Sequence, residues 1–499
     1  MKPGKVYLVG AGPGDPGLLT VKALRLIREA DLIVYDYLAN PDHLRHAKAS
    51  AEKICVGRNF RHRRLTQEKI NRLIIRAAQK GQAVVRLKGG DPYLFGRGGE
   101  EALFLRAHRI RFEVVPGVTS ATACAAYAGI PLTHREHSAS VTFLTGHRAH
   151  DENLDSVSWD AIVSLGGTIV VYMGFYNLEK IAERLIQKGK PAATPVSVIE
   201  WGTLPRQRSC DGTLANIAAR VREKKMKAPC LIVIGEVVAL RKKLNWFERL
   251  PLFGKTVVVT RTAEKSKVFR EKLAARGAEV IEFPVIEIRP VSDFSAMDEA
   301  IRSLEDFDWI IFTSHYGVRA FFDRLRAKHG KDARALGRTR VAAVGPATAC
   351  SLERRGVRPD LLPGHYETKA IVDAFKKKKN LRGKSVLLLR TDIAPPDLER
   401  GLKRLGAKTT RVTAYRTRRP SGRQAWPMRD PVDFVTFTSS STAHHFVKIM
   451  GLQKARKLSR KAVFASIGPV TTKTLKSYGL RVGCEAKIYT TDGLAAAIR

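Results

Sequence analysis

The chain has 499 residues, enough for two to four domains, and its hydrophobic content of 44% allows large buried cores. The chain has 88 Lys and Arg residues against 47 Asp and Glu, a formal net charge of +41. Such a charge favours binding to nucleic acid, to an anionic membrane or to a polyanionic substrate. No apolar run is long enough to span a bilayer, and the 6 scattered cysteines form no CxxC pair, which argues against a membrane span, a disulfide framework and a cysteine-based metal site.

The first half alternates short apolar strands with amphipathic helices. Strands are predicted at residues 6–9, 32–35 and 230–234, and helices at 20–29, capped by Thr20, and at 66–79. Regular alternation of this kind predicts an α/β fold.

The most informative stretch is RLKGGDPYLFGRGGEE, residues 86–101. Gly89 and Gly90 end a buried strand and let the backbone approach a ligand, while Pro92 restricts Asp91 to extended geometry. The carboxylate of Asp91 is therefore placed to accept hydrogen bonds from ligand hydroxyls. An ordinary strand-to-loop turn is the alternative interpretation.

Residues from about 5 to 247 closely resemble the uroporphyrinogen-III C-methyltransferases of the tetrapyrrole methylase family. The resemblance rests on residues 86–101 and on VYLVGAGPGDPGLLT (6–20), IVYD (33–36), PGVTSA (116–121), AGIPLTHR (128–135) and VYMG (171–174). It implies a two-lobed domain at residues 1–249 that binds S-adenosylmethionine and methylates uroporphyrinogen III twice to give precorrin-2. The cofactor-binding residues that it implies are Pro13, Gly89, Gly90, Asp91, Leu94, Thr119, Ser120, Met173 and Gly202.

The resemblance also implies catalytic residues. Asp36, at a strand end, matches the family's proton acceptor, although a solvated strand-end Asp is the alternative. Where the family usually has a lysine proposed as a proton donor, this chain has Arg58. Because arginine stays protonated, Arg58 is better suited to hold a substrate carboxylate than to donate a proton.

The second half begins with a new strand at 256–260 and contains an internal repeat. FDWIIFTS (307–314) matches VDFVTFTS (432–439), and VGPAT (344–348) matches IGPVT (467–471) at a similar distance downstream. The repeat predicts two similar α/β lobes, with hydroxyls and helix N-termini at strand ends that could bind carboxylates. Simple helix capping by these hydroxyls is the alternative.

These motifs, with TRTAEKS (260–266) and TAYRT (413–417), resemble uroporphyrinogen-III synthase across about 254–498. The resemblance implies a domain at 250–499 with one lobe at about 254–288 plus 420–499 and the other at 291–416. Its implied substrate is hydroxymethylbilane, closed with inversion of ring D to uroporphyrinogen III without a nucleophile or metal. Tyr415 could donate to the leaving hydroxyl, or could be a structural residue near the hinge. The predicted substrate-binding residues are Arg261, Ser314, Thr348, Ser439 and Thr471.

The two halves would then catalyse consecutive steps. We expect a bifunctional cytoplasmic enzyme leading to sirohaem, with cobalamin as a second destination, that is a homodimer through the methyltransferase domain and has no nucleic-acid or membrane partner. The charge of +41 leaves two alternatives from other classes, an RNA-binding or RNA-methylating protein and a binding scaffold with a degenerate synthase half.

Overall fold

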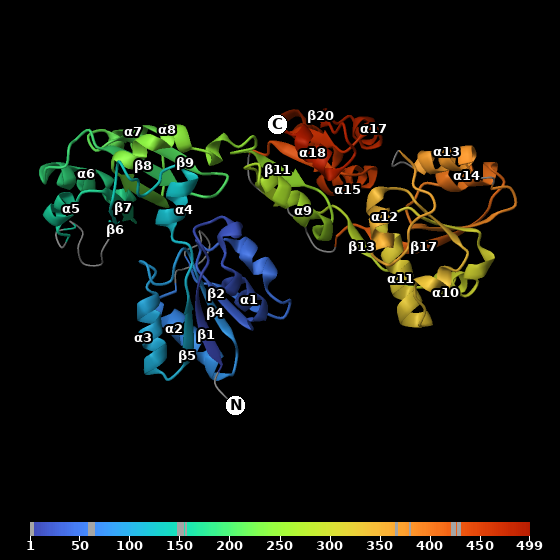
Figure 1. Cartoon of the computed structure of the whole chain (residues 1–499), viewed down its shortest axis with the longest axis horizontal. Coiled ribbons are helices and arrows are strands. Elements are labelled where there is room, and N and C mark those ends of the chain that lie inside the picture. Colours follow the sequence, from blue (N-terminus) through green and yellow to red (C-terminus); the bar gives the residue numbers. More distant parts are fainter. Residues whose placement is uncertain are drawn as a thin grey trace. The chain divides into compact units, whose positions relative to one another are not determined.

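The computed structural model describes residues 4–57, 65–146, 154, 157–364, 368–378, 381–420, 426 and 431–499. The chain forms two compact units (Figure 1). The first consists of Met1–Lys255 with Ala274–Glu279, and the second of Thr256–Leu273 with Val280–Arg499. Among the described residues, no helix is both long and apolar enough to cross a membrane.

The first sheet of the first unit is entirely parallel, as the strand–helix alternation predicts. Its strands, in spatial order, are β3 (Glu52–Cys55), β2 (Leu32–Tyr35), β4 (Val84–Lys88), β1 (Lys5–Gly10) and β5 (Arg111–Val115). The helices are α1 (Val21–Glu29), α2 (Gln67–Gln79) and α3 (Gly98–Ala107). In Figure 1, α2 and α3 lie on one side of this sheet and α1 on the other. The central strand β4 is therefore buried on both faces.

The second sheet of this unit is mixed. Its strands, in spatial order, are β6 (Val141–Thr145), β7 (Thr168–Tyr172), β10 (Cys230–Ile234), β8 (Pro195–Glu200) and β9 (Arg208–Thr213). Only β6 and β7 pair in parallel, and the other neighbours are antiparallel. The helices of this part are α4 (Ser120–Tyr127), α5 (Trp159–Leu165), α6 (Leu178–Gln187), α7 (Ile217–Glu223) and α8 (Arg241–Leu244).

The second unit contains two further sheets. One has the order β12 (Glu279–Glu282), β11 (Thr256–Val259), β18 (Phe434–Phe437), β19 (Val463–Ser466) and β20 (Val482–Glu485). The other has the order β13 (Glu287–Arg289), β17 (Lys408–Arg418), β16 (Ser385–Thr391), β14 (Trp309–Phe312) and β15 (Arg340–Ala343). The two copies of the sequence repeat supply the pairs β14–β15 and β18–β19, each parallel and adjacent, so the repeat is also structural.

The helices of the second unit follow its strands. Those beside the first of these sheets are α9 (Ala263–Ala274), α15 (Ser440–Met450), α16 (Leu452–Lys461), α17 (Pro469–Ser477) and α18 (Thr491–Ala497). Those beside the second are α10 (Ser295–Arg302), α11 (His315–His329), α12 (Pro346–Glu353), α13 (Thr368–Lys378) and α14 (Asp397–Arg404). Every sheet thus combines strands with covering helices, and the predicted α/β class is confirmed for both halves.

Candidate functional site

The carboxyl ends of β1, β4 and β5 bring three glycine-containing turns into backbone contact. Gly12 and Gly90 exchange hydrogen bonds through their backbone N–H and C=O groups, at 3.3 and 2.8 Å. A Cβ on Gly117 would lie 2.3 Å from the carbonyl oxygen of Gly90, so no side chain fits there. Gly90 has a φ of +67°, and the atoms nearest to the position of its missing Cβ are 3.9 Å away, so the space above it is open. The turns at Gly12, Gly90 and Gly117 thus form a surface of backbone atoms without side chains, here called the backbone floor, which a ligand can approach closely.

The Asp91 carboxylate holds the turns of this floor together through hydrogen bonds to backbone amides. Its Oδ1 accepts from the backbone amides of Tyr93 and Leu94 at 2.8 and 3.2 Å, and its Oδ2 accepts from the Gly117 amide at 3.0 Å. From the sequence, this carboxylate was predicted to accept hydrogen bonds from ligand hydroxyls. In the structure it organises the loop that would carry the ligand, and Leu94 is half-buried within that loop.

Several residues with strained backbone conformations lie in the loops of this unit. Five non-glycine residues with positive φ lie in the loops that follow β4, β7 and β8, namely Phe95, Arg97, Met173, Trp201 and Thr203. Each such residue stores on the order of 1–3 kcal/mol, which persists only where the surroundings impose it, and this strain is typical of ligand sites. Met173 has a φ of 54° and is 50% exposed, so it does not lie in the protein core.

The remaining predicted cofactor residues fall into two groups. The Thr119 hydroxyl lies 2.5 Å from the Tyr172 hydroxyl, which also accepts from the Ala121 amide at 3.1 Å, at the start of α4 beside half-buried Ser120. Burial raises the pKa of Tyr172. Gly202 has a packing reason to be glycine, because its Cβ would lie 2.4 Å from Cys124 Sγ.

Pro13 lies in a loop that both sheets of the unit hold in place. The next residues provide the contacts, since the Asp15 amide donates to Thr203 Oγ1 at 3.0 Å and the Tyr127 hydroxyl donates to Asp15 Oδ2 at 2.6 Å. Burial, and then the bond to Asp15, raises the pKa of Tyr127, which stays a neutral donor. The loop is therefore fixed in position before any ligand binds.

Asp36, directly after β2, is not a freely solvated strand end. Arg86 Nη2 donates to its Oδ1 at 2.6 Å, and Lys88 Nζ lies 4.0 Å from its Oδ2. Arg86 and Lys88 in turn contact Glu101 on α3, at 3.0 and 3.1 Å. The other predicted catalytic residue of this half, Arg58, lies outside the described residues.

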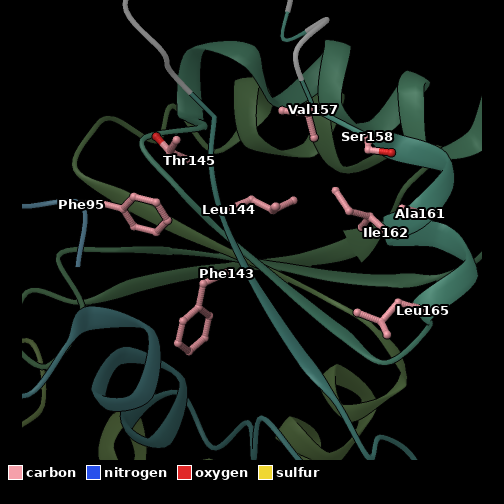
Figure 2. Close-up of a pocket in the computed structure, with 9 residues that line it drawn as sticks. All are labelled: Phe95, Phe143, Leu144, Thr145, Val157, Ser158, Ala161, Ile162 and Leu165. Carbon is pink, nitrogen blue, oxygen red and sulfur yellow. The ribbon is translucent and has the colours of Figure 1, made fainter. Parts of the chain in front are cut away.

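An apolar pocket adjoins the candidate cofactor site (Figure 2). Phe95, whose ring centroid lies 5.0 Å from that of Tyr172, reaches from the Asp91 loop toward β6 and α5. Figure 2 shows Leu144 pointing toward Ile162 across the pocket, with the hydroxyls of Thr145 and Ser158 near its edge. None of the 9 lining residues belongs to the predicted cofactor set.

In the second unit, two predicted site residues meet. The Ser314 hydroxyl, which also caps α11, donates to the Tyr415 hydroxyl at 2.8 Å. Tyr415 is only 8% exposed, and burial raises its pKa, so it is a neutral phenol that can donate a proton.

A cationic cluster of Arg261 and Lys265 lies beside this pair, together with the neutral His315. Lys265 Nζ and His315 Nδ1 are 3.1 Å apart, and Arg261 is half-buried near both. Burial, and then the charge of Arg261, lowers the pKa of Lys265 to about 8, while burial and then Lys265 lower that of His315 to about 3. In the described part of the chain no carboxylate pairs with Lys265 or Arg261, so the cluster is open to an anionic ligand.

The other predicted substrate residues lie at or near the starts of helices, and no contact between them and this cluster is found among the described residues. The Ser439 hydroxyl accepts a hydrogen bond from the Thr442 amide at 3.2 Å and so caps α15. This is the helix-capping role that the sequence left as the alternative to substrate binding. Thr348 and Thr471 are 5% and 4% exposed within α12 and α17. Both residues are therefore buried as a whole.

One group of side chains could hold a metal ion by geometry alone. His134, Glu136 and His137 bring possible ligand atoms within 4.8 Å of one another. The Glu136 amide already donates to His134 Nδ1 at 3.2 Å, so the turn is held together without an ion.

Comparison with known proteins identifies both halves. The family model described as tetrapyrrole (corrin/porphyrin) methylases matches residues 5–218, and that described as uroporphyrinogen-III synthase HemD matches 267–496. The porphyrin biosynthesis protein HemD of Ruminiclostridium josui is 36% identical over 485 residues, which cover 96% of this chain and 95% of that protein. The chain belongs to the fusions of a tetrapyrrole methylase with a uroporphyrinogen-III synthase. The resemblance stated from sequence motifs is thereby confirmed.

Two further proteins are similar to this chain over shorter stretches. The uroporphyrinogen-III C-methyltransferase of Bacillus subtilis (strain 168) is 40% identical over 384 residues, which cover 77% of this chain and 78% of that protein. A solved uroporphyrin-III C-methyl transferase of Thermus thermophilus, complexed with S-adenyl homocysteine, is 40% identical, covers 48% of this chain and 100% of its own, and has a TM-score of 0.41.

The sequence interpretation of this fusion missed several residues. In the methylase half these are Arg86, Lys88 and Glu101. A signal was available for the first two, because Arg86 and Lys88 are charged residues in a strand that is buried on both faces, where a charge needs a partner. In the synthase half they are Lys265 and His315, which are 50 positions apart and carry no local signal.

Proposed function

We propose that the chain is a bifunctional enzyme of tetrapyrrole biosynthesis. The synthase half would close hydroxymethylbilane, with inversion of ring D, to uroporphyrinogen III, and the methylase half would methylate this product twice to precorrin-2. The observation that carries the proposal is the presence of both family regions in one chain, each with its own clustered side chains. The boundary between the two catalytic domains would lie at about residue 250. The enzyme would be a cytoplasmic homodimer, and its product would lead to sirohaem and, secondarily, to cobalamin.

The residues of the methylase half fit S-adenosylmethionine. The backbone floor at Gly90 has open space where a Cβ would stand, the Asp91 loop is held by three amide hydrogen bonds, and Met173, in the loop after β7, is half-exposed. When bound, this cofactor supplies an electrophilic methyl group. The floor would admit the cofactor, and Met173 would pack on its apolar or sulfonium side.

Asp36 would act as the base of the methylation. A pyrrole carbon of the substrate gains the methyl group, and the macrocycle then loses a proton, which Asp36 accepts. Its Oδ1 is already bonded to Arg86, so its Oδ2 is the oxygen available for the proton. Arg58 would hold a substrate carboxylate.

In the synthase half, Tyr415 would donate to the leaving hydroxyl of hydroxymethylbilane. The linear substrate carries eight carboxylates, and the cationic cluster of Arg261 and Lys265 would bind some of them. Ser314 would orient Tyr415 through their hydrogen bond. No covalent intermediate is needed, because holding one folded conformation of a reactive substrate directs the closure.

Incubation with hydroxymethylbilane, with and without S-adenosylmethionine, tests the whole proposal. Uroporphyrinogen III should accumulate without the cofactor, and precorrin-2 should form with it. Formation of only the I isomer would exclude the synthase activity. Salt-sensitive RNA binding without either product would instead favour the RNA-methylating alternative.

Replacing Asp91 with Ala should weaken S-adenosylmethionine binding while leaving ring closure intact. The variant loses a carboxylate that three backbone amides use to hold the cofactor loop, and a charged hydrogen bond contributes on the order of 1.5–3 kcal/mol. Calorimetry measures the affinity directly. Asp332→Ala removes a comparable turn-capping carboxylate from the synthase half and is the matched control. Equal affinities of wild type and Asp91→Ala would remove Asp91 from the site.

Binding of carboxylates in the synthase half should weaken as the pH rises through about 8. Lys265 is protonated below its pKa of about 8 and neutral above it, and only the ammonium attracts a carboxylate. If one protonation is required, affinity falls up to about tenfold per pH unit above this value. Fluorescence quenching of the unreactive octacarboxylate uroporphyrin III measures it. A Lys265→Met variant with the same pH dependence as wild type would contradict the assignment.

A further inference from the structure

The methylase half contains a buried four-membered charge network at the end of β4. Arg86 bonds both Asp36 Oδ1, at 2.6 Å, and Glu101 Oε1, at 3.0 Å, and Lys88 Nζ lies 3.1 Å from Glu101 Oε2. Gln67 of α2 adds a neutral hydrogen bond to Glu101 Oε1 at 2.9 Å. With two cations and two anions, the network is formally neutral.

Only one end of this network reaches solvent. The side chains of Arg86, Lys88 and Glu101 are 3%, 3% and 1% exposed, whereas that of Asp36 is 32% exposed. Buried ion pairs add little net stability, since apolar residues of similar volume often do as well or better. What such a network can add is a fixed position for its exposed member.

The geometry leaves one oxygen of Asp36 available. The backbone N–H of Asp36 donates to the Leu87 carbonyl at 3.0 Å and so extends the ladder between β2 and β4. Oδ1 is held by Arg86, while Oδ2 lies 4.0 Å from Lys88 and accepts no hydrogen bond from any described residue. The carboxylate is thus oriented through one oxygen, and the other is left to accept a proton.

We propose that Arg86 and Glu101 are positioning residues that hold Asp36 as the base of methyl transfer and set the pH at which it loses activity. This inference rests on the proposed function of the methylase half. Neither residue touches the reacting atoms, because both are buried behind Asp36. Arg86 acts on Asp36 directly, and Glu101 acts through Arg86 and Lys88.

The two residues have opposite electrostatic effects on Asp36. The Arg86 cation stabilises the Asp36 carboxylate, so its removal makes Asp36 easier to protonate and moves the acid limb of the kcat/KM profile to higher pH. The Glu101 anion compensates Arg86 and Lys88, so Glu101→Gln leaves both cations less compensated and moves the acid limb to lower pH. A merely structural role would lower activity in both variants without opposite shifts.

The other groups around Asp36 do not change these signs. Lys88, on the same strand as Arg86, is present in both variants, and burial lowers its pKa. Tyr35 precedes Asp36 on β2 and lies opposite Cys55 of β3. Burial raises the pKa of Tyr35, which is neutral throughout the acid limb. Gln67, from α2, does not titrate.

The experiment compares full-length wild type with Arg86→Lys, Arg86→Met and Glu101→Gln. Steady-state methylation of uroporphyrinogen III is measured against pH, together with calorimetric affinity for S-adenosylmethionine. We expect the acid limb to move upward in Arg86→Met and downward in Glu101→Gln, each on the order of one pH unit, with kcat reduced and cofactor affinity unchanged. Arg86→Lys should retain most of the wild-type midpoint but lose kcat, because one ammonium cannot bond both carboxylates.

An exposed ion pair supplies the matched control. Arg222 and Glu179, 63% and 58% exposed in the same unit, form a comparable Arg–Glu pair, and Arg222→Met should leave the pH profile unchanged. Selective ¹³C labelling of aspartate carboxyls, with Asp36→Asn for assignment, provides a second readout that needs no turnover. Shifts of the Asp36 titration midpoint in the same direction, or no shift in folded variants, would overturn the proposal. If wild type fails to methylate, the proposed function fails, and the titration still decides whether the network controls Asp36.

Discussion

Replacing Asp36 with Asn is expected to slow methyl transfer by roughly 10²–10⁴-fold while leaving S-adenosylmethionine binding nearly unchanged. Asn has almost the same shape as Asp, and its amide oxygen can still accept the hydrogen bond from Arg86. It cannot accept a proton from the methylated macrocycle, so the deprotonation step loses its base. Turnover is measured as precorrin-2 formed from supplied uroporphyrinogen III, and cofactor affinity by calorimetry.

The matched control is Asp160→Asn on α5, where the side chain is 74% exposed. It makes the same chemical change away from the network and should leave turnover near wild type. Near-normal methylation by Asp36→Asn would show that the substrate proton leaves by another route, and Asp36 would then be only the exposed end of a buried ion network. Equal losses in turnover and cofactor affinity would indicate that the substitution disturbs the Gly90 floor instead.

Local signals predicted the secondary structure well. Thr20 and Thr66 cap helices that begin at the following residue, through hydrogen bonds to the amides of Ala23 and Lys69. The strands predicted at 32–35 and 230–234 have those bounds in the structure. Such predictions succeed because capping and hydrophobic alternation depend on residues only a few positions apart.

The chemistry of the site was less predictable, because it depends on pairs far apart in the chain. Asp36 and Arg86 are 50 positions apart, and so are Lys265 and His315. Neither pairing leaves a local pattern, and only the strand order β2–β4 places Asp36 beside Arg86. For Asp91 the motif predicted a turn after a buried strand, but the three amides that its carboxylate bonds could not be inferred from spacing alone.

Replacing Tyr415 with Phe is expected to slow ring closure by roughly 10²-fold, at the low end of the range for a lost general acid. The Tyr415 hydroxyl is buried and receives a hydrogen bond from Ser314, so its own proton is not used in that bond and can be donated to another acceptor. In our proposal this acceptor is the leaving hydroxyl of hydroxymethylbilane. Phe keeps the ring and its packing against Tyr316, whose centroid lies 5.6 Å away, so the fold should persist.

The ratio of product isomers makes this result sharper than a rate alone. Hydroxymethylbilane closes spontaneously to the I isomer, so a slower enzyme should yield a larger share of that isomer in the full-length chain without S-adenosylmethionine. Tyr478→Phe removes another tyrosine hydroxyl of the synthase half, one bonded to His444 Nδ1 at 2.6 Å, and should leave the ratio unchanged. A Tyr415→Phe variant that gives the III isomer at the wild-type rate would assign Tyr415 to packing, and the cationic cluster of Lys265 and Arg261 would then be the part of the site that directs closure.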